Sequence, residues 1–258
     1  MVNTASGKQG AARASQAIAA ELRRLIVTGE IVRGGFLEPT NALLDRFGVS
    51  RPTLREAFRL LENERLVSVS QGSRRGVHVL QPSSAAATRL GGQVLQERGA
   101  TIGELYEAAL GLEPFAARLL AERRDPDDVA RLRAHLATLD QTVEEEATHG
   151  HSVALARFHH LVVELTRNRA MLLMADLIAD AIERHQGREI ADRYAFAATV
   201  AERQEFRLLG TRSIDRLIGL IEAGDADAAE AHWRAHVRNA NAFWLKGVDP
   251  AMPIDVVR

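Results

Sequence analysis

A short turn, Gly48-Val49-Ser50-Arg51-Pro52, constrains the fold of this chain more than any other stretch. Gly48 can take the positive φ that ends one helix, and Ser50 is a favourable N-cap residue for the next one. Pro52 fits a first helical turn, where backbone N–H groups have no partner inside the helix. The turn therefore predicts a helix that begins at Arg51, with the Ser50 hydroxyl accepting a hydrogen bond from its first turn.

The helix predicted after this turn has two different faces. Its apolar residues recur at the spacing of one buried stripe, formed by Leu54, Ala57, Phe58 and Leu61. The opposite face has basic and hydroxyl side chains, which suit phosphate oxygens and base edges. These candidate DNA contacts are Ser50, Arg51, Thr53, Arg55 and Arg59. A face of arginines can also be a merely solvated surface, and the neighbouring segments favour DNA contact over that alternative.

The segments on either side of the turn complete a winged helix-turn-helix. Residues 41–47 have the pattern of a short helix, for which Thr40 can act as the cap. After the second helix, residues 66–70 alternate as a strand, a basic turn follows, and residues 77–80 form a returning strand. The basic turn at the tip of this predicted wing adds Arg74 as a candidate DNA contact.

Residues 15–81 resemble the winged helix-turn-helix domain of the GntR family of bacterial transcription regulators. The resemblance rests on residues 47–57, on Leu60-Leu61-Glu62 and on the glycine-bounded wing. It implies DNA contacts from Ser50, Arg51, Thr53 and Arg55 and, at the wing tip, from Gln71 and Gly72. Some relatives place an arginine on the DNA where this chain has Asn41, so the resemblance implies no such arginine contact here.

Composition indicates a two-domain cytoplasmic protein. A length of 258 residues allows two domains that each have a core, and the prominence of Ala, Leu and Arg predicts mainly helix. The chain has no cysteine, which excludes disulfides and thiol chemistry. No stretch reaches the roughly 18 consecutive apolar residues of a membrane span, so we expect no membrane partner. Residues 1–14 lack the apolar core of a signal peptide and are expected to form a disordered arm.

Charge is distributed unequally between the two halves of the chain. Residues 1–80 contain 12 Lys and Arg against 7 Asp and Glu, a net charge of +5. Residues 81–258 contain the other 21 basic and 27 acidic residues, a net charge of −6. A basic module for nucleic acid joined to an acidic module with another role fits this division.

From Thr101 onward only helical patterns occur. Thr101 and Glu104 predict a capping box, and Asp125-Pro126 predicts the start of another helix. Pro114 leaves two alternatives open, a kink within one helix or the start of a second helix. Further helices are expected from Ser152, over residues 170–186, 189–209 and 212–223, and from Asp225. We expect an antiparallel bundle of six or seven helices over residues 101–246, after a linker and start of the bundle at 82–100 and before a tail at 247–258.

This half of the chain resembles FCD, the helical ligand-binding domain of the FadR-like branch of the GntR family. The resemblance rests on Leu112-Glu113-Pro114, on Phe158-His159 and on residues 221–225 leading to His236. It implies that a small-molecule effector binds inside the bundle, and the candidate contacts are His159, His236, His185 and Arg157. The other histidines are expected in loops or on helix surfaces; they include His135, His149, His151 and His232.

The resemblance also raises the question of a metal. Many relatives hold a divalent ion with one Asp and three His. His159 and His236 match two of these positions, but the other two are Leu155 and Ile214. We therefore expect no cofactor, with the two histidines lining a metal-free pocket. A divalent metal held by His159 and His236 is the alternative.

Taken together, these patterns predict a mainly α protein with an N-terminal winged helix-turn-helix and a C-terminal helical bundle. The predicted function is that of a ligand-responsive transcription repressor, which binds a palindromic operator as a homodimer. One alternative is a constitutive DNA-binding regulator whose bundle only dimerises. A metal-dependent hydrolytic enzyme at His159 and His236 is a remote alternative, because no nucleophile or complete ligand set accompanies them.

Overall fold

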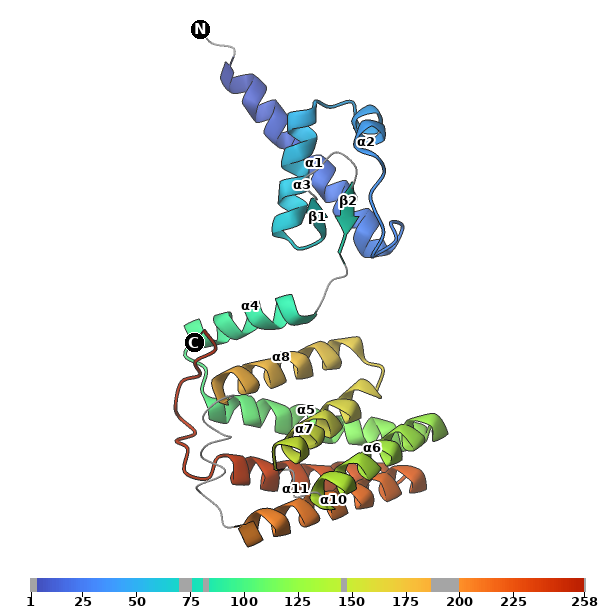
Figure 1. The fold of residues 1–258 in the computed structure, drawn as a ribbon, viewed down its shortest axis with the longest axis vertical. Coiled ribbons are helices and arrows are strands. Elements are labelled where there is room, and N and C mark those ends of the chain that lie inside the picture. The colour runs from blue at the N-terminus through green and yellow to red at the C-terminus, as the bar shows by residue number, and fades with distance from the viewer. Residues whose placement is uncertain (1–3, 70–75, 81–83, 145–147, 187–199, 258) are drawn as a thin grey trace. The chain divides into compact units, whose positions relative to one another are not determined.

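The chain folds into two compact units, Met1–Ser83 and Ser84–Arg258 (Figure 1). The computed structural model describes residues 4–69, 76–80, 84–144, 148–186 and 200–257. Among these residues, no helix has the length and apolar character that crossing a bilayer requires.

The first unit is the predicted winged helix-turn-helix. Its helices are α1 (Thr4–Thr28), α2 (Thr40–Phe47) and α3 (Arg51–Asn63). The strands β1 (Val67–Val69) and β2 (Val77–Val79) pair antiparallel, with Val67 opposite Val79. α1 begins before Ser15, so the expectation of a disordered arm is wrong for residues 4–14. This segment is rich in alanine, the best helix former, and extends a helix whose later turns are packed.

One apolar cluster holds the winged unit together. α1 and α3 pack against each other, and both strands cover the cluster. Its main side chains are Ile18, Leu22, Ile26, Leu43, Leu54, Phe58, Leu61, Val67 and Val79. The stripe predicted for α3 is confirmed, since its four apolar residues are all buried.

The regular elements of the second unit are all helices among its described residues. Its helices are α4 (Ser84–Glu97), α5 (Ile102–Arg123), α6 (Pro126–Glu144), α7 (Thr148–Glu164), α8 (Arg169–Gln186), α10 (Val200–Ala223) and α11 (Ala226–Trp244). The predicted capping box is present, because Thr101 Oγ1 accepts from the Glu104 N–H at 3.2 Å and Glu104 Oε2 accepts from the Thr101 N–H at 2.8 Å. α5 continues through Pro114, so one helix spans this region and no second helix starts there.

α4 occupies residues 84–97 and packs on α8, within the stretch expected as a linker and the start of the bundle. Two expected helix limits are wrong. α7 begins at Thr148 rather than at Ser152. α10 is continuous from Val200 to Ala223, where a break near residue 210 was expected, because one glycine weakens a packed helix without ending it. A helix was expected over residues 189–209, and its first part, residues 189–199, lies outside the described residues.

The C-terminal segment packs against the bundle and is not a free tail, so that expectation is also wrong. The Ile254 N–H donates to the Ala100 carbonyl at 2.9 Å, and the Ile102 N–H donates to the Met252 carbonyl at 3.1 Å. The side chains of Ile254 and Val256 are buried in a second apolar cluster. Their two-residue spacing places both on the same side of an extended segment.

Val256→Ala is expected to destabilise the helical unit by about 1.5 kcal/mol, since it removes two buried methyl groups. Val256 is 6 % exposed, whereas its neighbour Val257 is 67 % exposed and provides a matched control. Val257→Ala should change the free energy of unfolding by less than about 0.5 kcal/mol. Urea denaturation of the three proteins measures both values, and equal effects of the two substitutions would contradict the packing of this segment.

Candidate DNA interface and polar network of the helical unit

The turn between α2 and α3 has the predicted backbone conformation, but the Ser50 side chain does not make the predicted hydrogen bond. Gly48 has φ 61° and donates its N–H to the Leu44 carbonyl at 2.9 Å. Ser50 is the N-cap of α3, but its hydroxyl shares a 2.9 Å hydrogen bond with Thr53 Oγ1 and accepts from no backbone N–H. Thr40 is the first residue of α2 and not its cap, which is Pro39. Both predicted side-chain caps are therefore wrong.

The exposed face of α3 presents three of the predicted DNA-contacting arginines. Arg51, Arg55 and Arg59 are exposed, whereas Thr53 is 8 % exposed and turned into the unit. Arg59 lies 3.8 Å from Glu56. Within the described part of the chain, neither Arg51 nor Arg55 pairs with an acidic side chain. These two guanidinium groups remain available to an anionic partner such as DNA. Gln71, Gly72 and Arg74 lie outside the described residues.

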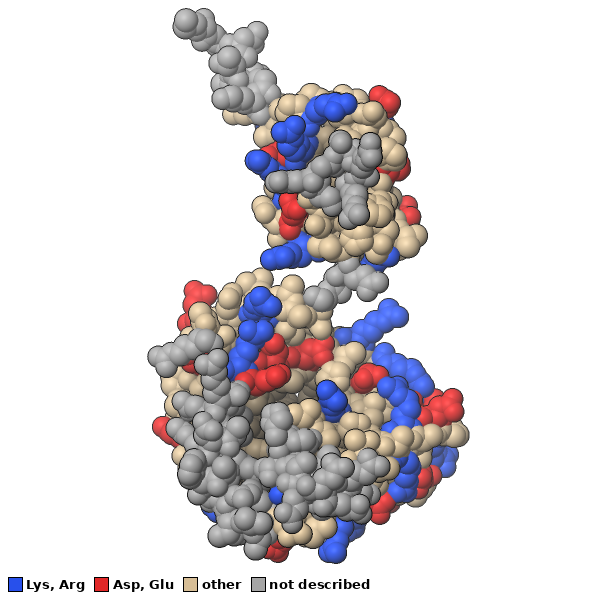
Figure 2. All heavy atoms as spheres, viewed as in Figure 1, with Lys and Arg blue, Asp and Glu red and all other residues tan. Residues whose placement is uncertain are grey.

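Other arginines of the winged unit are neutralised by carboxylates. Arg24 bridges Glu21 and Glu30, at 3.0 and 2.6 Å. Arg46 pairs with Glu38 at 2.9 Å. A group of basic side chains lies on the face of this unit seen in Figure 2, whereas acidic and basic side chains are interspersed on the helical unit. Arg51 and Arg55 have no acidic partner among the described residues and lie in the first two turns of α3, close to the helix end whose dipole also favours anions.

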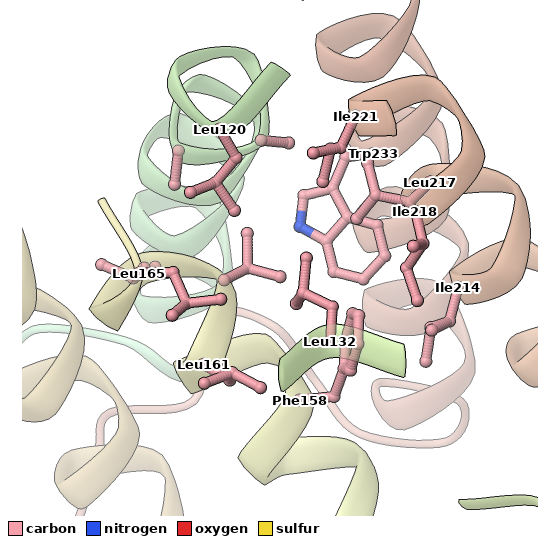
Figure 3. Close-up of a cluster of buried hydrophobic side chains, with 14 of the residues drawn as sticks. Leu120, Leu132, Phe158, Leu161, Leu165, Ile214, Leu217, Ile218, Ile221 and Trp233 are labelled. Atoms are coloured by element: carbon pink, nitrogen blue, oxygen red, sulfur yellow. The ribbon is translucent and has the colours of Figure 1, made fainter. Parts of the chain in front are cut away.

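A chain of polar side chains runs through the core of the helical unit, beside the Trp233 of Figure 3. His159 Nδ1 lies 2.6 Å from Glu113 Oε2, and the Trp233 indole N–H donates to the same oxygen at 3.2 Å. On the other side of its ring, His159 Nε2 faces His236 Nε2 at 3.4 Å. The two histidines that the sequence singled out are thus brought together.

The network continues from His236 to α10. His236 Nδ1 and Ser213 Oγ share a hydrogen bond of 3.0 Å, and His232 Nε2 lies 2.8 Å from the Ser213 carbonyl. Sequence reasoning did not identify Glu113 or Ser213 as site residues. Glu113 carried a signal, because it is a charged residue between the inward-facing Leu112 and Pro114. Ser213 carried none, since a serine within a helix is common.

The donors present do not fit the metal site that the resemblance implies. Leu155 and Ile214 are both buried in the main apolar cluster and contribute no donor. Two imidazoles remain, whereas zinc takes three or four protein donors. No group of three or more His, Cys, Asp or Glu among the described residues could hold a metal ion.

The structure does not place the other expected effector contacts in this network. Arg157 is exposed on α7. His185 Nδ1 accepts from the Asp255 N–H at 3.0 Å, so its ring binds the C-terminal segment. His151 was expected in a solvated loop and is buried, because α7 starts before it. His135 and His232 are partly buried, and each hydrogen-bonds to a backbone carbonyl of a neighbouring helix. Neither ring lies free on a surface.

Burial determines the charge of two of these histidines. The pKa of His236 is lowered to about 2, first by burial and then by the nearby His159 and His232. The pKa of His151 is lowered to about 4 by burial and by the charge of Arg207. Both rings are therefore neutral at neutral pH.

The stability of the helical unit is expected to fall as the pH drops below about 6.5, the pKa of histidine in an unfolded chain. Above that pH, His236 is neutral in both states and adds no pH dependence. Below it, the unfolded chain binds a proton that the native state excludes, so each such histidine removes about 1.4 kcal/mol per pH unit. Urea unfolding across this range measures the slope. His236→Asn should lower this slope by the contribution of one proton, about 1.4 kcal/mol per pH unit. An unchanged slope would contradict the assignment of His236 as a buried neutral ring.

Comparisons with known proteins follow the same division of the chain. The sequence model described as "Bacterial regulatory proteins, gntR family" matches residues 14–79, and the "FCD domain" model matches residues 104–239. An uncharacterized HTH-type transcriptional regulator of Mycobacterium tuberculosis is 29 % identical, covering 90 % of this chain and 89 % of the relative. The HTH-type transcriptional repressor NanR of Klebsiella aerogenes is 25 % identical, covering 89 % and 85 %.

A solved structure shows the same fold. The Streptococcus agalactiae GntR structure aligns with a TM-score of 0.64 and 23 % identity, covering 88 % of this chain and 98 % of the other.

Proposed function

The chain belongs to the GntR family and carries its FCD domain, and from this premise we propose that it is a ligand-responsive repressor that binds a palindromic operator as a homodimer. As a member of this family it is a transcription regulator and not an enzyme. The observation that carries the proposal is the pair Arg51 and Arg55, which are exposed in the first two turns of α3 and have no acidic partner in the described part of the chain. Relatives named as repressors, among them NanR, favour repression.

The proposed mode of DNA binding follows from the geometry of α3. Its N-terminal end enters the major groove, where Arg51 and Arg55 contact guanine edges or phosphates. β1 of the wing packs against α3, and the proposed second contact of the wing is with the minor groove. Two copies of the chain contact two half-sites, so the symmetry of the dimer matches the symmetry of the operator.

The proposed effector site is the polar network of the helical unit. An apolar core with a few hydrogen-bonding groups is the usual character of a small-molecule site. We propose that the effector binds beside His159 and His236 without a metal, because Leu155 and Ile214 stand where further donors would be needed. The effector shifts the two DNA-binding units only by its different affinity for the free and operator-bound states.

Selection of duplexes from a random pool tests DNA binding. The protein should enrich an inverted repeat, and the purified complex should contain two chains per duplex. Enrichment of no sequence would overturn the proposal, and one chain per duplex would overturn the homodimer.

A thermal-shift screen tests the response to a ligand, with acids, acyl-CoAs, other metabolites and divalent metals as probes. A responsive regulator is stabilised by one class, and the same compounds change its affinity for the enriched duplex. The second candidate is a constitutive regulator, which the two apolar residues at the family's ligand positions favour. Stabilisation by no compound would support it.

A further inference from the structure

One pair of side chains connects the start of α2 with the start of α3. The Arg51 guanidinium donates from Nη2 to Asn41 Oδ1 at 3.0 Å. Both residues are exposed and lie in the first turns of their helices. From this contact we infer that Asn41 is a positioning residue, which orients Arg51 toward one base pair of the operator. The inference rests on the proposed function of α3 in DNA binding.

Asn41 supplies an acceptor that carries no charge. Arg46, the residue directly before Phe47 in α2, is instead paired with the carboxylate of Glu38. A carboxylate beside Arg51 would compete with DNA for the guanidinium and repel the phosphates. The amide oxygen occupies one of the five N–H donors of an arginine and leaves the others for DNA. Asn41 therefore restrains Arg51 and leaves its positive charge unpaired.

The direction of an arginine matters most for reading a base. A bidentate contact with guanine O6 and N7 requires the guanidinium plane to match the base edge. A phosphate accepts hydrogen bonds from a wide range of directions and carries no sequence information. A side chain that is oriented before DNA arrives also loses less rotamer freedom on binding. Loss of Asn41 should consequently reduce sequence discrimination more than it reduces non-specific affinity.

A competing role for Asn41 is direct contact with DNA. Its Nδ2 group donates to no acceptor among the described residues, and an asparagine can pair with adenine. The two roles differ in one measurable way. A positioning residue acts only while Arg51 is present, whereas a direct contact contributes with or without it.

A double-mutant cycle on the full-length protein separates these roles. Wild type, Asn41→Ala, Arg51→Ala and the double variant are titrated against the duplex that the wild type enriches. The same titrations use duplexes with each base pair of the half-site replaced in turn. Asn41→Ala should weaken operator binding by about 3- to 10-fold, the net effect of one hydrogen bond. It should lose discrimination at the same base pair as Arg51→Ala, and add no further loss when Arg51 is absent.

The choice of a neutral acceptor is tested by Asn41→Asp. The aspartate keeps an oxygen beside Arg51 and adds a negative charge near the phosphates. Its affinity at low salt should be lower than that of Asn41→Ala, and the difference should shrink as salt screens the charge. An affinity equal to or above that of the wild type would overturn the role assigned to the neutral amide.

Asn63→Ala is the matched control, since Asn63 is an exposed asparagine at the other end of α3. It should bind the operator as the wild type does, and all variants should melt at the wild-type temperature. Unchanged binding of Asn41→Ala, or effects of Asn41→Ala and Arg51→Ala that multiply, would overturn the positioning role alone. A wild-type protein that binds no duplex would overturn the DNA-binding function itself, and this inference with it.

Discussion

Replacement of Trp233 by alanine is expected to lower the free energy of unfolding of the helical unit by about 3–5 kcal/mol. The indole is 0 % exposed, and Figure 3 shows it surrounded by apolar side chains of α5, α6, α7 and α10. It packs edge-on against Phe158 and stacks on the His236 ring, with ring centroids 5.8 and 4.3 Å apart. Its removal leaves a cavity that packed helices fill only partly, and Glu113 loses one hydrogen-bond donor.

Urea denaturation followed by circular dichroism measures this loss. Trp233→Phe is the graded control, because phenylalanine keeps an aromatic ring in the cluster and removes the N–H that binds Glu113. It should destabilise the unit by less than alanine does. A Trp233→Ala protein as stable as the wild type would show that the indole is not a central packing group.

The double substitution Arg51→Ala and Arg55→Ala is expected to remove nearly all sequence-specific DNA binding. An arginine that contacts a base contributes about 1–3 kcal/mol, so loss of both should weaken operator binding between about 30-fold and more than 10⁴-fold. Stability should be unchanged, because both side chains are exposed and neither belongs to the apolar cluster of the winged unit. Fluorescence anisotropy with the enriched duplex and a scrambled duplex gives the operator and non-specific affinities.

Arg59→Ala is the comparison for this experiment. Arg59 lies one turn further along α3 and near Glu56. We expect Arg59 to contact a phosphate. Arg59→Ala should therefore weaken binding to all sequences equally and reduce the slope of log affinity against log salt concentration by about 1. Operator binding by the double variant at the wild-type level would contradict the assignment of α3 as the helix that reads the operator.

Local sequence rules predicted the winged unit well. The turn at Gly48, the start of α3 at Arg51 and the buried stripe from Leu54 to Leu61 are as expected. Each depends on residues within one or two helical turns, as does the capping box of Thr101 and Glu104. The resemblance to the FCD domain singled out His159 and His236, and the structure places their Nε2 atoms 3.4 Å apart. Wing-tip contacts and effector binding stay predictions.

One error has a local origin, because the Ser50 hydroxyl was expected to cap α3 and instead hydrogen-bonds to Thr53, a predicted DNA contact that is buried. Non-local contacts account for the next two errors. His185 was expected to be near the effector, and the backbone of Asp255 binds it instead. Residues 247–258 were expected to form a tail because six apolar residues among polar and proline positions give no strong periodic signal.

The sequence by itself determined that the chain is mainly helical and which face of α3 is buried, because backbone propensity and hydrophobic periodicity act over a few residues. Its motifs also determined which family the chain resembles. Only the tertiary structure decided that Asn41 accepts a hydrogen bond from Arg51, that Glu113 and Ser213 hydrogen-bond to the two histidines, and that Val256 packs against the bundle. Each of these depends on side chains that are close in space and distant along the chain. No local pattern specifies such a pair, since the packing of whole helices sets its distance.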